Sequence, residues 1–361
     1  LERNNTVIPI DPAYPKKHID YIIKDSAPDK IISDIDSYND LFQEKRSNIT
    51  QNDVAYILYT SGSTGHPKGV EVTYEALSNF IEGISETIDF SPGKRIACLT
   101  TISFDIFFLE SIVALNKGLT VVLADEEEQR NPKLMAKFIQ DNAVDIIQMT
   151  PSRMQLLLNY DKELICLKSV KEIMIGGEAF PFGLLQTLQE KTTARIYNMY
   201  GPTETTIWST ISNLTYKDHI DIGRPIKNTE IYIMDDSLTL LPSGQIGEIC
   251  IGGKGLAKGY VGRDDLTAEK FIYLPQKPNV RVYRTGDMGR HLPDGDLEYL
   301  GRTDNQVKIR GHRVELEEIE SHLNQIKGIH QAVVIALETN ETDKILQAFY
   351  TSDATLNQKE I

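Results

Sequence analysis

Residues 59–69 read Tyr59-Thr60-Ser61-Gly62-Ser63-Thr64-Gly65-His66-Pro67-Lys68-Gly69, and they follow an apolar run at 54–59 that is typical of a buried strand. Glycines let backbone N–H groups converge on anionic oxygens, hydroxyl groups add donors, and Lys68 adds a compact positive charge. The sequence therefore predicts a loop that binds a polyphosphate. A Walker A motif has four residues between its glycines and then Gly-Lys-Ser/Thr. This loop departs from that spacing, so a P-loop kinase or NTPase is not indicated.

Length and composition set the class of protein. A chain of 361 residues is long enough for one large and one small domain, and 40% apolar with 25% charged residues is an ordinary globular balance. The formal net charge of −14 argues against a nucleic-acid partner. The three cysteines are isolated, without metal-ligand or disulfide spacing, and no apolar run is long enough for a membrane span. We expect a cytoplasmic protein with neither nucleic-acid nor membrane partners.

Alternation of apolar runs and helical patterns predicts βαβ units with a mostly parallel sheet in the first part of the chain. The predicted strands are 54–59, 119–123, 145–149 and 170–175, and the predicted helices are 74–84 and 132–140. The acidic run at 125–128 is interpreted as a solvated loop.

The pattern changes after about residue 221. Short strands at 230–234 and 247–253, with turns at 242–244 and 294–295, predict a small β-rich layer. From residue 306 a strand at 307–309, a helix at 315–325 and a strand at 329–337 predict a further unit. We therefore expect two domains, 1–303 and 304–361.

Four further strings follow the phosphate loop in a fixed order. They are Asn198-Met199-Tyr200-Gly201-Pro202-Thr203-Glu204-Thr205-Thr206, Gly247 to Gly253 with Gly259-Tyr260, Tyr283-Arg284-Thr285-Gly286-Asp287, and Gly301-Arg302-Thr303-Asp304-Asn305-Gln306-Val307-Lys308-Ile309-Arg310-Gly311. Over nearly its whole length the chain resembles the adenylate-forming superfamily: acyl-CoA synthetases, luciferases and the adenylation domains of nonribosomal peptide synthetases. The resemblance implies an α/β fold. It has a large core of two mostly parallel βα subdomains with a small β-rich layer, followed by a small α+β C-terminal subdomain.

The resemblance also implies ATP and Mg²⁺ as cofactors, with Lys68, Thr203 and Glu204 as catalytic residues and Glu204 as the metal ligand. Tyr200 is expected to stack on adenine, and Asp287 to accept hydrogen bonds from the ribose hydroxyls. The implied nucleotide-binding set is Thr60, Ser61, Gly62, Ser63, Thr64, Gly65, Gly177, Glu178, Ala179, Asn198, Tyr200, Gly201, Asp287 and Arg302. Asp304 resembles the hinge of the family. Residues 308–310 are expected to approach the site in a second pose, with a basic surface strand as the alternative.

Asp105 is the residue that says most about the substrate. It stands in an apolar run, where a carboxylate is costly to bury without a partner. By resemblance it pairs with the α-ammonium group of an amino acid, and a helix N-cap is the alternative. The implied pocket wall is Asp105, Ile106, Leu109, Gln148, Met174, Gly176, Met199, Ile207 and Trp208. Bulky Met199, Ile207 and Trp208 would fill the side-chain space, so we expect glycine, with alanine next.

The resemblance implies thioester transfer to the phosphopantetheine of a carrier-protein domain, with condensation or other synthetase domains as neighbours. The alternatives are a stand-alone ligase of the same superfamily, such as a carrier-protein ligase or an acyl-CoA synthetase, and an inactive interaction module. Compared with the family, we expect the sequence to lack the first part of the core and the C-terminal lysine motif. On that basis little adenylation by this stretch alone is expected.

Overall fold

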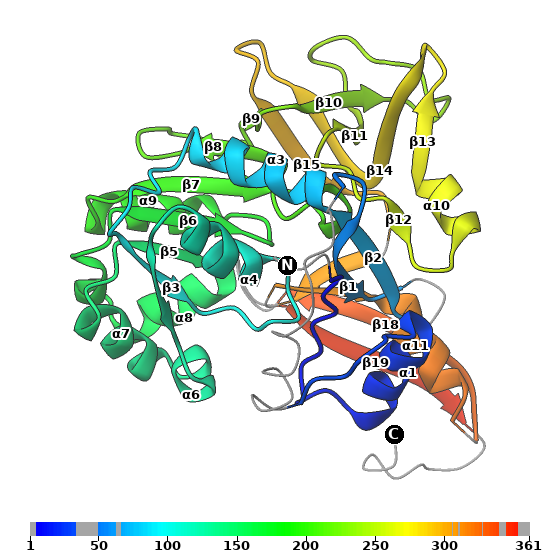
Figure 1. Ribbon diagram of the computed structural model, residues 1–361, viewed down its shortest axis with the longest axis horizontal. Coiled ribbons are helices and arrows are strands. Elements are labelled where there is room, and N and C mark those ends of the chain that lie inside the picture. Colours follow the sequence, from blue (N-terminus) through cyan, green and yellow to red (C-terminus); the bar gives the residue numbers. More distant parts are fainter. Residues whose placement is uncertain are drawn as a thin grey trace.

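The computed structural model describes residues 5–33, 50–62, 66–304, 306–309, 311–326, 328–338 and 344–352 (Figure 1). Within these residues the strands form five sheets. The α-helices are α1 (Lys16–Ser26), α3 (Tyr74–Ser85), α4 (Ile106–Phe108), α5 (Ala114–Asn116), α6 (Glu126–Arg130), α7 (Pro132–Asp141), α8 (Pro151–Tyr160), α9 (Phe182–Lys191), α10 (Asp264–Lys270) and α11 (Leu316–Asn324). A π-helix, η2 (Leu109–Val113), and the 3₁₀ turns η3 (Ile165–Leu167) and η4 (Thr203–Thr205) complete the helical elements of the described chain.

The largest sheet has seven strands in the order β4-β3-β5-β6-β7-β8-β9. They are β4 (Thr120–Leu123), β3 (Arg95–Cys98), β5 (Ile146–Met149), β6 (Glu172–Gly176), β7 (Arg195–Tyr200), β8 (Thr210–Asn213) and β9 (Arg224–Pro225). The pairings from β4 to β7 are parallel, as predicted, and β8 and β9 are antiparallel. Because parallel strands end at the same edge, the loops after β5, β6 and β7 meet there.

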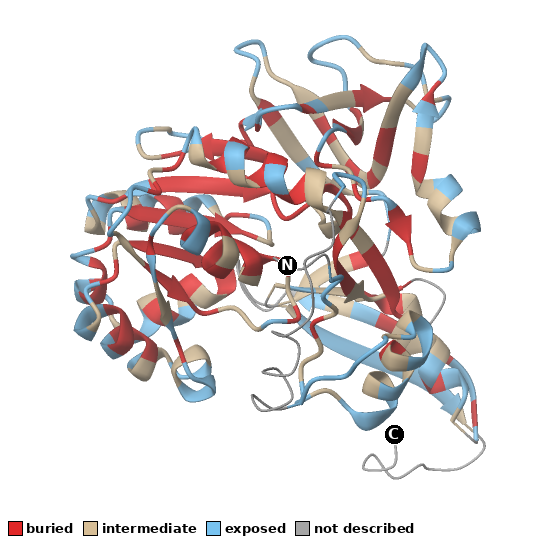
Figure 2. Cartoon of the chain, in the orientation of Figure 1, coloured by how far each residue is buried: buried red, intermediate tan, exposed pale blue. Residues whose placement is uncertain are grey.

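Two apolar clusters cover the two faces of this sheet. One face packs under α7, α8 and α9 through residues such as Phe138, Leu157 and Leu185. The other face packs under α3 and the antiparallel sheet of β1 (Val54–Thr60), β2 (Lys68–Thr73) and β12 (Gly259–Tyr260), through residues such as Tyr56 and Phe80. Figure 2 shows the central strands of the large sheet, β5, β6 and β7, as almost continuously buried. The predicted strand at 54–59 and helix at 74–84 are confirmed as β1 and α3.

The prediction of a loop at the acidic run was wrong. Residues 126–130 form α6, because Asp125 and Glu128 make a reciprocal capping box. The Asp125 carboxylate accepts from the Glu128 N–H at 2.8 Å, and the Glu128 carboxylate accepts from the Asp125 N–H at 2.9 Å. Two otherwise unpaired donors at the helix start are thereby satisfied.

The predicted β-rich layer is confirmed as a five-stranded antiparallel sheet, at the top right of Figure 1. Its strands are β10 (Thr229–Met234), β11 (Gly247–Gly253), β13 (Phe271–Leu274), β14 (Lys277–His291) and β15 (Leu297–Arg302). The long strand β14 pairs with β11, β13 and β15, so it carries Asp287 to the edge that faces the large sheet.

Residues 306–352 are called the C-terminal unit below. It contains the hairpin β16 (Gln306–Ile309) and β17 (His312–Glu315), helix α11, and the hairpin β18 (Ile329–Glu338) and β19 (Lys344–Ser352). Leu316, Leu323, Ile329 and Val334 form an apolar cluster of its own. Asp304 lies between β15 and β16, so the predicted boundary falls in this connection, and its role as a domain boundary stays a prediction.

Candidate active site

A buried carboxylate, Glu204, stands at the centre of the site. It is fully buried on the 3₁₀ turn after β7, and the Tyr260 hydroxyl donates to its Oε1 at 2.8 Å. Lys68 Nζ lies 3.5 Å from the same oxygen, and Arg313 Nη1 lies 3.1 Å from both carboxylate oxygens. Burial alone would raise the pKa of Glu204, but the charges of Arg313 and Lys68 hold it below its ordinary value. The carboxylate is therefore ionised at neutral pH.

Lys68 begins β2, directly after the phosphate loop, and its ammonium group is buried beside Tyr260. Burial lowers the pKa of Lys68 to about 8, and the positive charge of Arg313 adds to the effect. Gly62 and His66 lie close together, because a Cβ on Gly62 would lie 2.2 Å from the His66 carbonyl oxygen. Thr60 and Ser61 lie at the start of the loop, and the Thr60 hydroxyl is buried with no hydrogen-bond partner among the described residues. Ser63, Thr64 and Gly65 lie outside the described residues.

Tyr200, Asp287 and Arg302 come together from three strands. The Tyr200 hydroxyl donates to Asp287 Oδ2 at 2.7 Å, and Arg302 Nη1 donates to Asp287 Oδ1 at 2.7 Å. Arg302 also donates to both oxygens of Asp304, at 2.7 and 2.8 Å. One guanidinium thus joins the carboxylate predicted to bind ribose to the residue predicted to act as the hinge.

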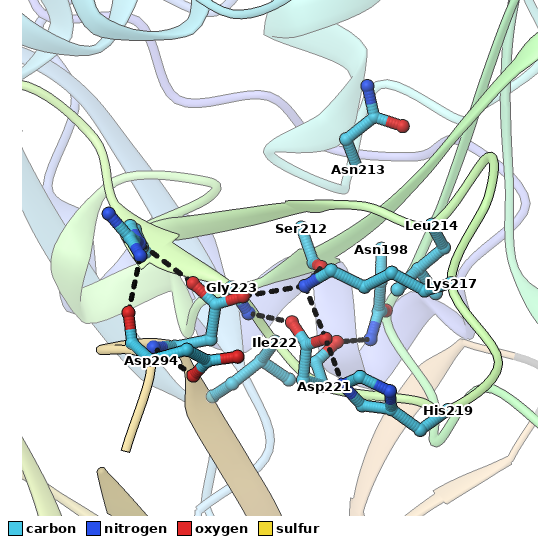
Figure 3. A network of polar contacts seen from close by, with 12 residues as sticks. Asn198, Ser212, Asn213, Leu214, Lys217, His219, Asp221, Ile222, Gly223 and Asp294 are labelled. Atoms are coloured by element: carbon cyan, nitrogen blue, oxygen red, sulfur yellow. Dashed lines mark hydrogen bonds and ion pairs between the residues drawn. The ribbon is translucent and has the colours of Figure 1, made fainter. Parts of the chain in front are cut away.

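Figure 3 shows the polar network that positions the Asn198 side chain. Its Nδ2 donates to the Asp221 carbonyl oxygen at 2.8 Å, so the amide oxygen faces away from that carbonyl. Lys217 Nζ lies 2.6 Å from both Asp221 Oδ2 and Asp296 Oδ2, which ties the large sheet to the turn before β15. The predicted nucleotide residue Asn198 is therefore positioned by contacts far from the phosphate loop.

Gly177, Glu178 and Ala179 follow β6 at the same sheet edge, and Gly201 follows β7. Gly177 adopts a φ of +87°, which favours glycine. Glu178 Oε2 accepts from the Ser152 hydroxyl at 2.6 Å, and Glu178 Oε1 accepts from the Gly311 N–H. The segment after β6 is thus fixed both to α8 and to the C-terminal unit.

Asp105 is 8% exposed and precedes the short helix α4. It makes no side-chain capping hydrogen bond, which removes the main support for the N-cap alternative. Burial raises the pKa of Asp105, and a hydrogen bond with the Thr203 side chain opposes that rise. Asp105, Thr203 and Glu204 therefore lie in one neighbourhood.

The predicted wall residues share one side of the large sheet. Ile106, Leu109, Met174, Met199, Ile207 and Trp208 belong to a single buried cluster. A Cβ on Gly176 would lie 2.8 Å from Trp208 Cη2 and 2.7 Å from the Met199 carbonyl oxygen, so only glycine lets the indole pack there. Gln148 is buried, and its Nε2 donates to the Met149 carbonyl oxygen while its Oε1 has no partner in the described chain. The two residues before Trp208, Thr206 and Ile207, both have φ near +65°, a strained conformation that is common at binding sites.

Two charged residues near the site, Arg313 and Glu110, escaped the sequence analysis, and a third, Lys308, was predicted. Arg313 lies two residues beyond the last string, on the side of β17 that faces Glu204. Because side chains alternate along a strand, a strand that continues from Gly311 puts Arg313 on the same side as Gly311, and this pattern could have identified it. Glu110 is buried on the π-helix, and its carboxylate accepts three hydrogen bonds of 2.9 Å from Leu99 and Thr100. Lys308 was predicted to approach the site, and Asp287 and Asp105 are the carboxylates that counter the lowering of its pKa by burial.

Of the described charged groups in this cluster, Glu204 itself is the one that could bind a divalent cation together with phosphate oxygens, since its charged neighbours Lys68 and Arg313 are cations. An ionised oxygen ligand is available, and Mg²⁺ prefers one or two carboxylates together with phosphate oxygens.

None of the described helices is long and apolar enough to cross a membrane.

The sequence and the fold both match known proteins. A profile of the AMP-binding enzyme family matches residues 34–261. A dimodular nonribosomal peptide synthase of Bacillus subtilis (strain 168) is 39% identical over 388 residues, which covers 100% of this chain and 16% of the relative. The chain thus spans about a sixth of that relative's length.

Two solved structures share the fold. A four-domain nonribosomal peptide synthetase bound to AMP and glycine has a TM-score of 0.74 at 33% identity, covering 98% of this chain and 28% of the other. A Vibrio cholerae adenylation domain, AlmE, in complex with glycyl-adenosine-5'-phosphate has a TM-score of 0.86 at 23% identity, covering 98% and 77%. The predicted adenylate-forming fold is confirmed. The chain belongs to the AMP-binding enzyme family, as an adenylation domain of the nonribosomal peptide synthetase type.

Proposed function

We propose that this chain activates a small amino acid, with glycine preferred, as its aminoacyl-adenylate at the expense of ATP. The activated acid then passes to the phosphopantetheine thiol of a carrier-protein domain in a larger synthetase. The observation that carries the proposal is a buried carboxylate, Asp105, next to Ile106, which belongs to the same buried cluster as Trp208 packed on Gly176.

Asp105 supports an amino acid over other carboxylic acids. It makes no ion pair among the described residues, although the charge of Lys308 acts on it, and burial disfavours its charged form. The α-ammonium group of an amino acid would supply a direct ion pair. A fatty or aryl acid has no such group and would leave the buried carboxylate without a paired cation.

The pocket wall supports a small side chain. Trp208 is 2% exposed, and Met174, Met199 and Ile207 are buried in the same cluster. A filled pocket rejects larger side chains by steric overlap. One methyl group is worth only about 1–3 kcal/mol of discrimination, so alanine is the expected competitor. The synthetase structure at 33% identity holds glycine with AMP, which favours the same choice here.

In the proposed reaction a carboxylate oxygen of the amino acid attacks the α-phosphorus of ATP. The bond from that phosphorus to the bridging oxygen breaks, and pyrophosphate leaves. Asp105 would orient the acid, Asp287 and Tyr200 would hold the nucleoside, and Lys68 would hold the phosphates in line. When bound on Glu204, Mg²⁺ supplies charge stabilisation for the phosphate oxygens.

Amino-acid-dependent pyrophosphate exchange on the full protein that contains this chain tests the proposal, with each common amino acid and with fatty and aryl acids. We expect exchange with glycine above all and with alanine second. Strong exchange with a fatty or aryl acid and none with any amino acid would refute the substrate assignment.

A further inference from the structure

Glu110 is a fully buried carboxylate that the proposed reaction does not use. It lies on the π-helix η2, in a helical run that begins directly after Asp105. Its Oε2 accepts from the N–H groups of Leu99 and Thr100, each at 2.9 Å, and its Oε1 accepts from the Thr100 hydroxyl at 2.9 Å. All three donors precede Asp105 in the chain. One carboxylate therefore joins the segment before Asp105 to the helix after it.

Leu99 is the residue that Glu110 holds first. It is fully buried and follows the last residue of β3, so its backbone groups need partners within the protein. Glu110 accepts from its N–H, and Arg153 Nη1 donates to its carbonyl oxygen at 3.0 Å. Both backbone groups of Leu99 are thus held by charged side chains, one from the π-helix and one from α8.

Asp105 lies inside the loop that these contacts close. Within the loop, Thr101 Oγ1 donates to Asp11 Oδ2 at 2.8 Å, which fixes the chain from the N-terminal side. The Phe108 N–H donates to the Asp105 carbonyl oxygen at 2.9 Å, at the start of the helical run that leads to Glu110. The place of the Asp105 carboxylate therefore depends on where Glu110 holds the first residues of the loop.

We propose that Glu110 is a positioning residue for amino-acid recognition, which holds residues 99–100 so that the Asp105 carboxylate meets the α-ammonium group of the substrate. The role depends on the reach of the side chain, because the three hydrogen bonds come from neutral donors. Glutamine can make the same contacts, since its oxygen can accept from both N–H groups and its NH₂ group can donate to the Thr100 hydroxyl. Aspartate keeps the charge but is one methylene shorter. The inference rests on the proposed function, because it takes Asp105 as the partner of the ammonium group.

Pyrophosphate exchange on the full protein tests this role in Glu110→Asp and Glu110→Gln, with the KM for glycine and the KM for ATP measured separately. A misplacement of about 1 Å can cost about 100-fold in rate. In Glu110→Asp we expect kcat/KM for glycine to fall about 100-fold, through the KM for glycine, with the KM for ATP unchanged. Glu110→Gln should stay within about threefold of the wild-type protein, because its reach is the same.

Glu172→Asp is the matched control. Glu172 is equally buried but lies at the start of β6, at the opposite end of that strand from the site, where it pairs with Lys94 and Arg195. The same shortening there should leave both KM values unchanged. Circular dichroism and urea unfolding of each variant show how much of it is folded under the assay conditions.

A double-mutant cycle with Asp105→Asn separates positioning from a general defect. If Glu110 acts through Asp105, Glu110→Asp should change kcat/KM for glycine by less than about threefold once residue 105 is asparagine. Exchange with glycolate, which has no ammonium group, should fall no more in Glu110→Asp than in Glu172→Asp. If Glu110→Asp does not fold, Thr100→Val decides the question. It removes only the hydroxyl donor and should raise the KM for glycine alone, by about three- to tenfold.

The outcomes separate this inference from the proposed function. Equal losses with glycine and glycolate, additive effects in the cycle, or a Glu110→Gln variant as impaired as Glu110→Asp overturn the inference while the proposed function stands. An unchanged KM for glycine in folded Glu110→Asp or, where that variant does not fold, in Thr100→Val has the same consequence. An Asp105→Asn variant that activates glycine as well as the wild-type protein overturns the substrate assignment of the proposed function and this inference with it.

Discussion

Replacement of Asp105 by asparagine should weaken activation of amino acids without affecting the nucleotide. Asparagine has the same shape and keeps one acceptor oxygen for Thr203, but it has no charge to offer an ammonium group. Truncating one partner of a buried, hydrogen-bonded charge pair costs about 2–5 kcal/mol. Because about 1.4 kcal/mol is a factor of ten, kcat/KM for glycine should fall about 30-fold to several thousand-fold. The KM for ATP should stay unchanged.

The structure supports the upper half of this range. Asp105 is 8% exposed, and burial raises the pKa of the neighbouring Tyr56, which the Asp105 carboxylate raises further. An ion pair with little water around it is screened less than a surface pair. Since burial already raises the pKa of Asp105, asparagine should not lower the free energy of unfolding.

Pyrophosphate exchange with glycine and with glycolate separates the charge effect from a general defect. Glycolate has a hydroxyl group where glycine has its ammonium, so its low activity should be unchanged or improved in Asp105→Asn. Asp125→Asn, at the cap of α6, is the matched control and should leave exchange unaltered. A loss of less than threefold with glycine, or an equal loss with glycolate, would contradict pairing of Asp105 with the ammonium group.

Three further outcomes follow from the same geometry. Trp208→Ala should open the pocket, and pyrophosphate exchange with larger amino acids should rise about 10- to 200-fold relative to glycine for each methylene that becomes accommodated; an unchanged profile would show that the wall is elsewhere. Burial lowers the pKa of Lys68 to about 8, so its phosphate-binding charge is lost above that pH. We therefore expect kcat/KM for ATP to fall as the pH rises above about 8. In Lys68→Arg this fall should move to higher pH, because a guanidinium keeps its charge. Lys217→Met leaves the buried Asp221 without its ammonium partner at 2.6 Å and should lower the free energy of urea unfolding by about 3 kcal/mol; a change below 0.5 kcal/mol would mean that His219 alone satisfies this carboxylate.

Sequence patterns predicted the elements that carry their own local signal. Strand 145–149 and helix 132–140 are found as β5 and α7, because apolar periodicity and Pro132 at the first helical turn act within a few residues. The wall residues Gln148, Met174, Gly176 and Met199 share one face for a similar reason, since side chains alternate along β5, β6 and β7. The other wall residues lie outside these strands, so their place in the cluster depends on how the segments around 105–109 and 207–208 pack on the sheet.

The failures have two different causes. Asp125 and Glu128 were interpreted as a run of charge, although their spacing is that of a capping box. The π-helix at Leu109–Val113 has no such local signal. Its wider turn lets the Glu110 carboxylate accept from the N–H groups of Leu99 and Thr100, a contact that depends on where β3 ends. Arg313 was missed because its partner lies 109 residues away and on another unit of the fold.

The nature of the contacts explains why a ligand could control the position of the C-terminal unit. This unit has an apolar cluster of its own. Its hairpin meets the rest of the chain through polar contacts, namely Arg313 with Glu204, Gly311 with Glu178, and the Arg313 carbonyl oxygen with Ser61, and through the His312 ring packed on Phe104. Glu204, Glu178 and Ser61 are also predicted binders of ATP or its metal. A ligand that binds these same groups would therefore have to replace the contacts that the hairpin makes with them.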